Sequence, residues 1–518
     1  MMSALAGFDK VVVVNFGGQY THLIARRVRE LSVYSEIVNY AEFSRDLVDR
    51  LKPKAIILSG GPSSIYAEGA PKVGSWVLEL GLPVLGICYG HQLIASIVGG
   101  RVERGLGEYG KTEIEVVSRD PLFEGWNSRE FVWMSHGDYV AELPEDRAVV
   151  LARSVETGYI AAFRLKDRPV YGVQFHPEVA HTPKGRRLLE NFVSGIGGAQ
   201  KNWVWGNIVD MIVEDLKRTV PPGEKVLCAV SGGIDSTVTA LLLKRAVGDR
   251  LVTVFVNHGL LREGEAEAVL SMLRNLGLDP VYIDASKEFL GLLKGVKDCE
   301  EKRKVIGELF ARIFRDVADG DRAIKWLAQG TTYPDVIESG FALGADRIKS
   351  HHNVAGLPEW LGLKVVEPLR YLYKDEVRRI ATVLGVPEEW ARRHPFPGPG
   401  LAVRVVGEVT EEKLAIARRA SKIVEEELTK AGLHSKVWQA FAVVGDDRWV
   451  GVKGDKRVLG YVVTVRIVES EDGMTADWSR VPHEVLEKIA SRITREIPGV
   501  TMVTYAITSK PPSTIEPC

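Results

Sequence analysis

A cysteine between two glycines is the first feature of the chain whose spacing predicts chemistry. Cys88 lies in the segment GICYGHQ (residues 86–92), after an apolar run and before a helical pattern. A glycine two positions to either side permits the sharp strand-to-helix turn of a nucleophile elbow. Such a turn places the side chain at a helix N-terminus, which favours the reactive thiolate. Taken alone, Cys88 is equally consistent with a buried structural cysteine.

A histidine and a glutamate two residues apart supply the partners that a nucleophilic cysteine needs. The segment YGVQF (residues 171–175) predicts a strand, and His176-Pro177-Glu178 follows it. Side chains at positions i and i+2 project to the same side, so Glu178 can orient the His176 imidazole. A thiol, a base and an orienting carboxylate form a triad for acyl transfer. We therefore predict that Cys88, His176 and Glu178 are catalytic.

A glycine pair after another predicted strand offers main-chain N–H groups. The segment SGGP (residues 59–62) follows the apolar run 54–58. We expect Gly60, together with the amide of Tyr89, to form an oxyanion hole for the tetrahedral intermediate. An ordinary β-turn is the alternative for this segment.

A second glycine-rich turn, SGGIDS (residues 231–236), joins an apolar strand to a helix. Two glycines and flanking hydroxyls at a helix N-terminus form a nest of N–H donors that suits a phosphate chain. The turn is not a Walker A loop, because it contains no lysine. Its carboxylate, on Asp235, suits Mg²⁺ that bridges phosphates. A plain tight turn is the alternative. The residues expected to bind nucleotide here are Ser231, Gly232, Gly233, Ile234, Asp235, Ser236 and Thr237.

Alternating strand and helix patterns predict an α/β protein. The first region has β-branched or apolar runs that predict buried strands at 10–16, 54–58 and 83–87, and Tyr20, Ile24, Val28 and Leu31 form a helical stripe. Shorter strands are expected at 111–117, 131–133, 159–163 and 169–175. The second region predicts strands at 225–230, 251–256 and 280–283 with helices at 237–247 and 263–276, and then long helical stretches to about 393.

Three domains are predicted from these patterns. Glycines near residue 197 end the first domain, and the segment HPFPGPG (residues 394–400) interrupts any helix or central strand. The remainder predicts a strand at 460–468, a helix at 485–497 and a strand at 501–508. The predicted domains are residues 9–199, 200–394 and 395–518.

Composition bounds the class of protein. The chain has 518 residues, 45% hydrophobic and 26% charged, which excludes a disordered protein. The 67 basic and 68 acidic residues give a net charge of −1, which argues against nucleic-acid binding. No apolar run reaches 18 residues and no signal peptide is evident, so we expect a cytoplasmic protein without membrane contact. The four cysteines are far apart in sequence, and their spacing predicts neither a disulfide framework nor a zinc site. They are Cys88, Cys228, Cys299 and Cys518.

The motifs resemble two known families. GICYGHQ, SHGD (residues 135–138) and GVQFHPEV (residues 172–179) resemble the class I glutamine amidotransferase domain, and SGGIDS resembles the PP-loop of N-type ATP pyrophosphatases. The first resemblance implies that Cys88 attacks the side-chain amide of glutamine, assisted by His176 and Glu178. The second implies cleavage of ATP to AMP and pyrophosphate while a substrate oxygen is adenylated. The implied folds are a class I amidotransferase α/β domain, a doubly wound PP-loop α/β domain and a small α+β C-terminal domain.

Longer segments, from about residue 10 to residue 516, resemble the glutamine-hydrolysing GMP synthase family. The resemblance implies amination of XMP to GMP through an adenyl-XMP intermediate, the last step of de novo GMP synthesis, by a homodimer joined through the C-terminal domain. The segments are VNHGLLREGE (256–265), EEKRKVIGELF (300–310), LAQGTTYPDVIESG (327–340), IKSHHNVAGLP (348–358), VVEPLRYLYKDEVR (365–378), RHPFPGPGLAVRVVGEVT (393–410), ESEDGMTADW (469–478) and SKPPSTIE (509–516).

The same resemblance assigns further residues. Lys349 and the pair His351-His352 fall in a lid segment over ATP, and Asp335 contacts Mg²⁺ or nucleotide unless it only stabilises a turn. The positions implied for XMP are Arg303, Gln439, Lys510, Ile515 and Glu516. Arg303 and Lys510 suit a monophosphate.

The chain departs from the family pattern in three places. Val444-Gly445-Asp446-Asp447 replaces a Leu-Leu-Pro run, Pro517-Cys518 follows Glu516 where Trp-Glu is usual, and Cys299 stands where proline is common. The first two departures lie in the predicted substrate-binding domain, so they affect the details of XMP binding and leave the chemistry unchanged.

Three other classes of protein are alternatives for a chain with these motifs. A glutamine-dependent NAD synthetase shares S-G-G-x-D-S but carries a nitrilase-like glutaminase without the elbow and H-P-E pattern. A tRNA-thiolating PP-loop protein would have a basic surface and paired cysteines. A non-catalytic nucleotide sensor would not need an intact set of Cys88, His176, Glu178 and Asp235.

Overall fold

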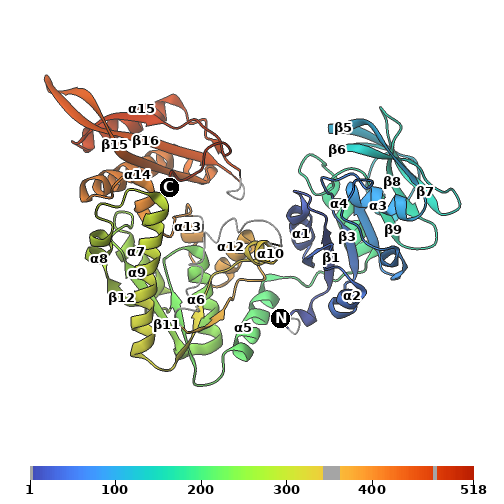
Figure 1. The fold of residues 1–518 in the computed structure, drawn as a ribbon, viewed down its shortest axis with the longest axis horizontal. Coiled ribbons are helices and arrows are strands. Elements are labelled where there is room, and N and C mark those ends of the chain that lie inside the picture. Colours follow the sequence, from blue (N-terminus) through green and yellow to red (C-terminus); the bar gives the residue numbers. More distant parts are fainter. Residues whose placement is uncertain (1–3, 342–361, 392, 471–474) are drawn as a thin grey trace. The chain divides into compact units, whose positions relative to one another are not determined.

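The computed structural model describes residues 4–341, 362–391, 393–470 and 475–518. The chain divides into two compact units, Met1–Met211 with Ile337–Leu343, and Ile212–Val336 with Gly344–Cys518. Figure 1 labels the helices and strands of both units. The predicted nucleotide contact Lys349 and the pair His351-His352 lie outside the described residues.

The first unit is built on a nine-stranded mixed sheet. Its order is β2-β1-β3-β4-β9-β8-β7-β5-β6. The strands from β2 to β9 pair in parallel, and those from β9 to β6 pair antiparallel. Every residue of β3, β4 and β9 is buried, as expected for parallel strands covered on both faces. The bounds are β1 Lys10–Asn15, β2 Tyr34–Asn39, β3 Ala55–Leu58, β4 Val84–Ile87, β5 Arg101–Val116, β6 Arg129–Glu142, β7 Ala148–Ser154, β8 Ile160–Leu165 and β9 Val170–Val173.

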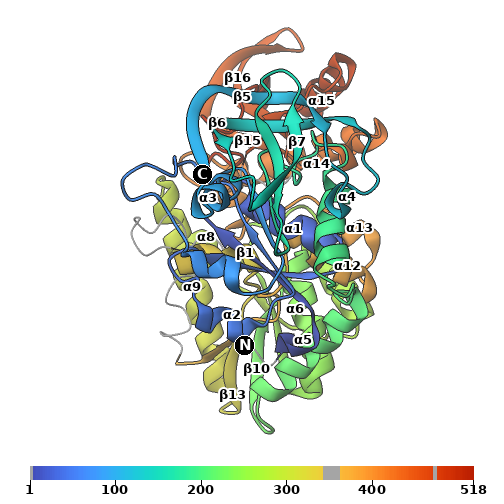
Figure 2. The same ribbon diagram turned by 90° about the vertical axis from the view of Figure 1, so that its right-hand side faces the viewer.

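The edge pair β5 and β6 is longer than the sequence predicts. The pairing runs from Arg101 opposite Glu142 to Glu115 opposite Arg129, and Figure 2 shows the two strands side by side. The sequence predicted strands only at 111–117 and 131–133. Much of β5 carries charged residues and glycines on exposed or half-buried positions, so it lacks the apolar alternation by which a strand is recognised.

Helices cover the sheet of the first unit. Ile24 and Val28 are buried in α1 and Leu31 is buried just after it, which confirms most of the predicted stripe, whereas Tyr20 precedes the helix and is half-buried. The bounds are α1 Thr21–Glu30, α2 Arg45–Leu51, α3 Tyr89–Ile97, α4 Gly185–Glu190, the π-helix η4 Asn191–Ile196 and the 3₁₀ turns η1 Ala4–Gly7, η2 Ser75–Glu79 and η3 Pro121–Phe123. A further helix, α5 Trp205–Thr219, begins in the first unit and ends in the second.

The second unit contains a five-stranded parallel sheet in the order β12-β11-β10-β13-β14. The chain leaves β10 toward one edge and later returns on its other side, so the topological switch point lies between β10 and β13. In open α/β sheets, ligands bind at the carboxyl ends of the strands at such a point. The bounds are β10 Lys225–Ala229, β11 Leu251–Asn257, β12 Val281–Asp284, β13 Ile324–Ala328 and β14 Lys364–Val366.

Two of these strands were not predicted. The sequence predicted helices up to about residue 393, yet β13 and β14 lie in that region. Short apolar runs of this kind cannot be told from helix segments by periodicity alone. The helices of this region are α6 Ile234–Val247, η5 Gly248–Arg250, α7 Glu265–Asn275, α8 Ser286–Leu292, α9 Cys299–Gly320, α10 Tyr333–Phe341, α12 Lys374–Val383 and α13 Glu388–Ala391.

A smaller α+β part completes the second unit. β16 pairs antiparallel with β15 and β17 and parallel with β18. Helices α14 and α15 are tied together by Arg492, which lies 2.7 Å from both Glu426 and Glu427. The bounds are η6 Gly400–Arg404, α14 Glu411–Lys430, η7 His434–Lys436, β15 Gln439–Lys453, β16 Lys456–Glu469, β17 Asp477–Trp478, α15 His483–Glu496 and β18 Val500–Tyr505.

One hydrophobic core joins the two sheets of the second unit. It includes Leu227 and Val254 of the parallel sheet together with Ile423 of α14 and Ile467 of β16. The core therefore crosses the predicted boundary at residue 394, which stays a prediction. No helix in the described part of the chain is long and apolar enough to span a membrane.

The prediction that the cysteines form no disulfide was wrong. Cys299, the first residue of α9, is bonded to Cys518, with the two Cα atoms 5.2 Å apart. The partners are separated by 219 residues, and no spacing rule links cysteines that far apart. Cys88 and Cys228 are free and buried. Burial raises the pKa of the Cys228 thiol to about 12, so this cysteine is unreactive.

Candidate active sites

Close backbone contacts around Cys88 explain the glycine spacing. Cys88 lies between β4 and α3 with φ +52° and ψ −102°, a conformation that is strained for a residue with a side chain. A Cβ at Gly86 would lie 2.4 Å from the carbonyl of Gly90, and a Cβ at Gly90 would lie 2.3 Å from the main-chain oxygen of Leu58. Because backbone atoms cannot move aside to make room for a Cβ atom, both positions require glycine. The segment is therefore a nucleophile elbow.

His176 and Glu178 complete the predicted triad. The Nδ1 atom of His176 lies 2.7 Å from Oε1 of Glu178, and both side chains are buried. The His176 amide donates to the main-chain oxygen of Trp133 at 2.9 Å, and the His176 carbonyl accepts from the Thr182 hydroxyl at 2.7 Å. The imidazole is thus held from its ring and from both sides of its backbone.

Electrostatics at the triad favour a protonated imidazole. Burial lowers the pKa of His176, but the Glu178 carboxylate and the Cys88 sulfur outweigh burial and raise this pKa well above 6.5. An imidazolium next to the sulfur stabilises a negative charge there. The arrangement can therefore supply a nucleophilic sulfur and return a proton to a leaving amine.

The predicted oxyanion segment lies against this triad. A Cβ at Gly60 would be 3.3 Å from Cε1 of His176 and 3.7 Å from Cβ of Cys88. The main-chain oxygen of Ser59 accepts from the Gly90 amide at 3.2 Å, which ties the segment to the start of α3. Burial raises the pKa of the Tyr89 phenol to about 12, so this side chain stays neutral, and its hydroxyl donates to a main-chain oxygen.

A buried histidine and glutamate near Cys88 were not assigned a role from the sequence. His136 Nε2 lies 3.0 Å from Glu108 Oε2, and Ser154 donates to the other oxygen of Glu108 at 2.5 Å. Burial raises the pKa of Glu108, but the hydrogen bonds from His136 and Ser154 outweigh it and keep this pKa below its usual value. The main-chain oxygen of Ser135 lies 3.7 Å from the Cys88 sulfur. This network fixes β5 and β6 beside the triad.

The second predicted site follows β10. Gly232 has φ +78°, and a Cβ there would lie 2.4 Å from Val269, so only glycine fits. The Ser231 amide donates to Oγ of Ser236 at 3.2 Å, and the Gly233 amide donates to Oγ of Ser231 at 3.3 Å. Ser231 and Gly233 are exposed, so a ligand can reach the turn. This geometry agrees with a phosphate-binding loop.

The remaining loop residues begin α6. Ile234 is the first residue of this helix, and the hydroxyl of buried Thr237 donates to the main-chain oxygen of Gly233 at 2.9 Å. A Cβ at Gly330, which follows β13, would lie 3.6 Å from Cβ of Asp235. The segments after β10 and β13 therefore meet at the switch point, with Asp235 between them.

The chemistry of this donor set suits a metal-bound nucleotide. The described residues contain no group of three or more His, Cys, Asp or Glu side chains that could hold a metal ion. Mg²⁺ in nucleotide sites commonly takes one or two carboxylates with the phosphates, and Asp235 supplies one. Asp335 accepts from the amide and the hydroxyl of Thr332 at 2.8 and 2.7 Å. This geometry favours the turn-stabilising alternative for Asp335.

The residues predicted for XMP lie in the second unit, and the structure brings several of them together. Gln439, at the start of β15, donates to Oε1 of Glu516 at 2.5 Å. Arg303, on α9, donates to the main-chain oxygen of Cys518. Lys510 pairs through its backbone with Ala476. Half-buried Ile515 directly precedes Glu516.

Sequence reasoning missed Arg404. Its side chain is only 1% exposed, and it binds Glu516 through two bonds, from Nε at 3.1 Å and from Nη2 at 2.9 Å. The guanidinium carbon lies 4.2 Å from the ring centre of Phe441. A single charge inside the apolar run LAVRVV (residues 401–406) was the available signal, because a buried charge needs a partner.

Comparison with known proteins agrees with this architecture. Residues 12–196 match the family "Glutamine amidotransferase class-I", residues 204–317 match "NAD synthase", and residues 426–517 match "GMP synthase C terminal domain". Together with the elbow and the His176–Glu178 pair, the first match defines a class I glutamine amidotransferase fused to a nucleotide-binding α/β unit.

Relatives over the whole chain name the family. Three proteins called "GMP synthase [glutamine-hydrolyzing]" each match 98% of this chain. The protein from Pyrobaculum aerophilum is 61% identical over 100% of its own length, that from Aeropyrum pernix 54% over 98%, and that from Carboxydothermus hydrogenoformans 52% over 99%. The chain belongs to the glutamine-hydrolysing GMP synthase family.

The match to NAD synthase concerns the alternative that the chain is a glutamine-dependent NAD synthetase. It is confined to residues 204–317, which contain the SGGIDS loop that both families share. The N-terminal part matches class I amidotransferases and the C-terminal part matches GMP synthases. The resemblance to NAD synthase therefore concerns only the nucleotide-binding region.

Replacing Glu178 by glutamine tests the electrostatics of the triad. Without the carboxylate, burial dominates, so the pKa of His176 falls. Wild-type His176 should keep its proton to a pH well above 6.5, whereas the Glu178→Gln variant should lose it at a midpoint lower by at least about one pH unit. NMR titration of ring-labelled histidines measures this midpoint. Glu115→Gln, at an exposed position of β5, is the matched control. An unchanged midpoint for His176 would contradict the account.

Two glycine substitutions separate the site from the fold. Gly90→Ala drives a methyl group into the Leu58 carbonyl, so the melting temperature should fall by about 5 °C or more. Gly60→Ala points its methyl group at the triad instead. It should leave the melting temperature unchanged and slow glutamine hydrolysis about tenfold. Calorimetry and a glutamate-release assay give both quantities. Full hydrolysis by Gly60→Ala would place Gly60 outside the site.

Proposed function

We propose that this protein aminates XMP to GMP with ammonia taken from glutamine, while ATP is converted to AMP and pyrophosphate. The observation that carries the proposal is the Cys88–His176–Glu178 geometry on the same chain as the exposed SGGIDS loop. Full-length similarity to proteins named "GMP synthase [glutamine-hydrolyzing]" supports XMP as the acceptor. ATP is the nucleotide substrate that this family uses.

The first half of the reaction takes place at Cys88. The sulfur attacks the amide carbon of glutamine, and the N–H groups of Gly60 and Tyr89 stabilise the resulting oxyanion. His176, oriented by Glu178, gives its proton to the leaving nitrogen, so ammonia departs and a thioester remains. Water then attacks the thioester with His176 as base, and glutamate is released.

The second half takes place at the switch point of the parallel sheet. Residues 231–237 hold the phosphates at the N-terminus of α6, and the C2 oxygen of XMP attacks the α-phosphorus of ATP with loss of pyrophosphate. Ammonia then displaces AMP from C2 of the adenyl-XMP. Asp235 would hold Mg²⁺, which supplies positive charge to the phosphates. Lys349 stays a predicted contact to ATP.

XMP is proposed to bind Arg303, Gln439, Lys510, Ile515 and Glu516. Arg303 and Lys510 suit its monophosphate, because charge-assisted hydrogen bonds to phosphate are strong. Glu516 accepts from Arg404 and Gln439, which leaves further carboxylate lone pairs for hydroxyl or ring N–H donors of the substrate.

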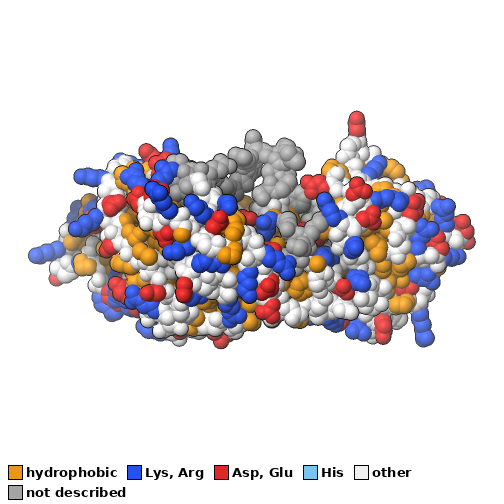
Figure 3. Space-filling view, turned by 90° about the horizontal axis from the view of Figure 1, so that it is seen from below, with side chains coloured by type: hydrophobic (Ala, Val, Ile, Leu, Met, Phe, Trp, Pro, Cys, Tyr) orange, Lys and Arg blue, Asp and Glu red, His pale blue; other side chains and the backbone are white. Residues whose placement is uncertain are grey.

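Organisation and assembly form part of the same proposal. Family matches that end at residue 196 and resume at residue 204 support the predicted boundary near residue 199. We propose domains at 9–199, 200–394 and 395–518, a homodimer and a cytoplasmic location. On the face in Figure 3, basic and acidic side chains are interspersed, which supports the absence of a nucleic-acid partner.

Cys88→Ala tests whether the two halves are separate. The variant should lose glutamine-dependent GMP formation by about a thousandfold, because no sulfur remains to attack the amide. With ammonium in place of glutamine it should form GMP at the wild-type rate. An end-point assay with XMP, MgATP and either nitrogen source measures both. Loss of both activities in a folded variant would contradict separate sites, and retained glutamine use would remove Cys88 from the mechanism.

Asp235→Asn tests the metal role. The variant should release pyrophosphate about a hundredfold more slowly, and calorimetry should show that Mg²⁺ no longer strengthens binding of an ATP analogue. Asp249→Asn, at a fully exposed carboxylate just after α6, is the matched control and should behave as wild type. Unchanged pyrophosphate release by Asp235→Asn would refute this role, and so would Mg²⁺-dependent analogue binding of wild-type strength.

A further inference from the structure

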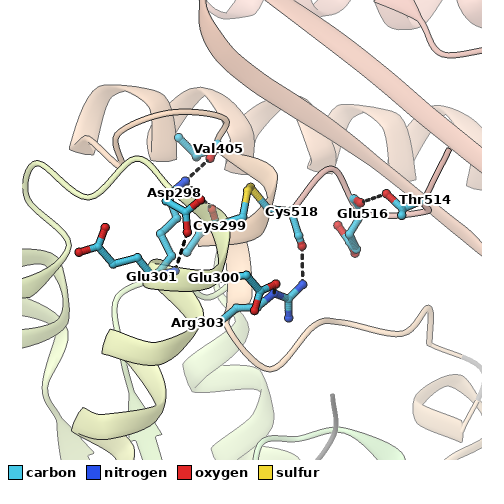
Figure 4. The surroundings of a disulfide bond; sticks show 11 residues. Asp298, Cys299, Glu300, Glu301, Arg303, Val405, Thr514, Glu516 and Cys518 are labelled. Atoms are coloured by element: carbon cyan, nitrogen blue, oxygen red, sulfur yellow. Dashed lines mark hydrogen bonds and ion pairs between the residues drawn. A yellow bond between two sulfur atoms is a disulfide. The ribbon is translucent and has the colours of Figure 1, made fainter. Parts of the chain in front are cut away.

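We propose that the Cys299–Cys518 disulfide, together with Arg404, positions the substrate-binding end of the chain, so that its reduction weakens binding of XMP. The inference rests on the proposed function, because it takes Arg303 and Glu516 as contacts to XMP. Figure 4 shows the surroundings of the bond. The bond joins Cys299, the first residue of α9, to Cys518, two residues beyond Glu516.

The segment that contains Glu516 has little secondary structure of its own. After β18, residues 506–518 form a single isolated bridge, between Lys510 and Ala476. Buried Arg466 donates to the main-chain oxygens of Thr508 at 2.5 Å and Thr514 at 3.1 Å. A segment without ladder hydrogen bonds depends on such anchors for its position.

Arg404 provides the next anchor along this segment. Its two bonds to the Glu516 carboxylate have the fork geometry that fixes both the direction and the rotation of a carboxylate. Lys302 of α9 is fully buried and donates to the main-chain oxygen of Val405 at 2.6 Å. The backbone next to Arg404 is therefore held directly by α9.

The disulfide holds the C-terminal segment beyond Glu516. Cys299 and Arg303 are four residues apart on α9 and so lie on the same face of the helix. Cys299 is bonded to Cys518 through sulfur, and Arg303 donates to the main-chain oxygen of Cys518. In Figure 4 the Arg303 side chain points at that oxygen, beside the bond. The disulfide thus fixes the chain two residues beyond Glu516, and the Cys518 carbonyl accepts from the guanidinium that is predicted to bind phosphate.

A prepositioned carboxylate and guanidinium bind a ligand without the loss of conformational freedom that a mobile segment would incur. Breaking the sulfur–sulfur bond frees residues 517 and 518 while Arg404 still holds Glu516. The expected effect is therefore weaker binding of XMP without loss of the fold. ATP contacts the separate 231–237 loop, so its binding should not change.

The test measures ammonium-dependent GMP formation by the full chain. In the Cys518→Ser variant, KM for XMP should rise about fivefold, with kcat, KM for ATP and glutamine hydrolysis as in wild type. Dithiothreitol should have the same effect on the wild type, because it reduces the bond to two protein thiols and is itself oxidised to a cyclic disulfide. Reoxidation should restore the KM. The Cys299→Ser, Cys518→Ser double variant should not respond to dithiothreitol.

Two results would overturn the inference. An unchanged KM for XMP in the reduced wild type, with only a lower melting temperature, would make the bond merely structural. Equal rises of KM for XMP and ATP would mean general loosening. Reduction of the folded wild type keeps the test decisive should the serine variant fail to fold. Arg303→Gln separates the two proposals. If that variant binds XMP as wild type, the proposed XMP site is wrong. If that variant binds XMP weakly but reduction of the wild type has no effect on KM for XMP, only the positioning role of the disulfide fails.

Discussion

The structure of the first unit depends on a backbone contact that only glycine allows. Gly90 lies against the Leu58 carbonyl, and Gly86 against Gly90 itself, so β3, β4 and the start of α3 converge at one point. This convergence holds Cys88 in its strained conformation with positive φ and places this residue beside His176 and Gly60. A buried carboxylate then keeps the imidazole charged. The backbone contacts thus set the position of Cys88, and the charge on the His176 imidazole favours a reactive sulfur.

The same construction serves different chemistry in the second unit. Again a parallel strand ends in a glycine turn that begins a helix, but the turn after β10 is closed by hydrogen bonds to the Ser231 and Ser236 hydroxyls, and it carries a carboxylate at the start of α6 rather than a thiol. Both loops lie at the carboxyl ends of parallel strands, where α/β sheets bind their ligands. The end of the chain that is proposed to bind XMP is different. It lacks a supporting sheet and is fixed by Arg466, Arg404 and a disulfide.

Local signals made the geometry around Cys88, His176 and Glu178 predictable, whereas features that depend on long-range contacts were not predicted. Cys88 was visible because its glycines are two residues away, and Glu178 because it follows His176 by two. The sequences of β13 and of the charged strand β5 show no clear alternation of apolar and polar residues. Strand β13 was therefore missed, and β5 was predicted too short. Arg404 and the disulfide join residues more than one hundred positions apart, and only folding brings them together.

In the proposed reaction, one chain frees nitrogen from glutamine and attaches it to an adenylated purine. The most direct measurement supplies glutamine labelled with ¹⁵N at its side-chain amide, together with XMP and MgATP, and follows products by mass spectrometry. The account predicts one label in each GMP formed, with one AMP and one pyrophosphate for each. Unlabelled GMP, or ADP with orthophosphate in place of AMP and pyrophosphate, would contradict it.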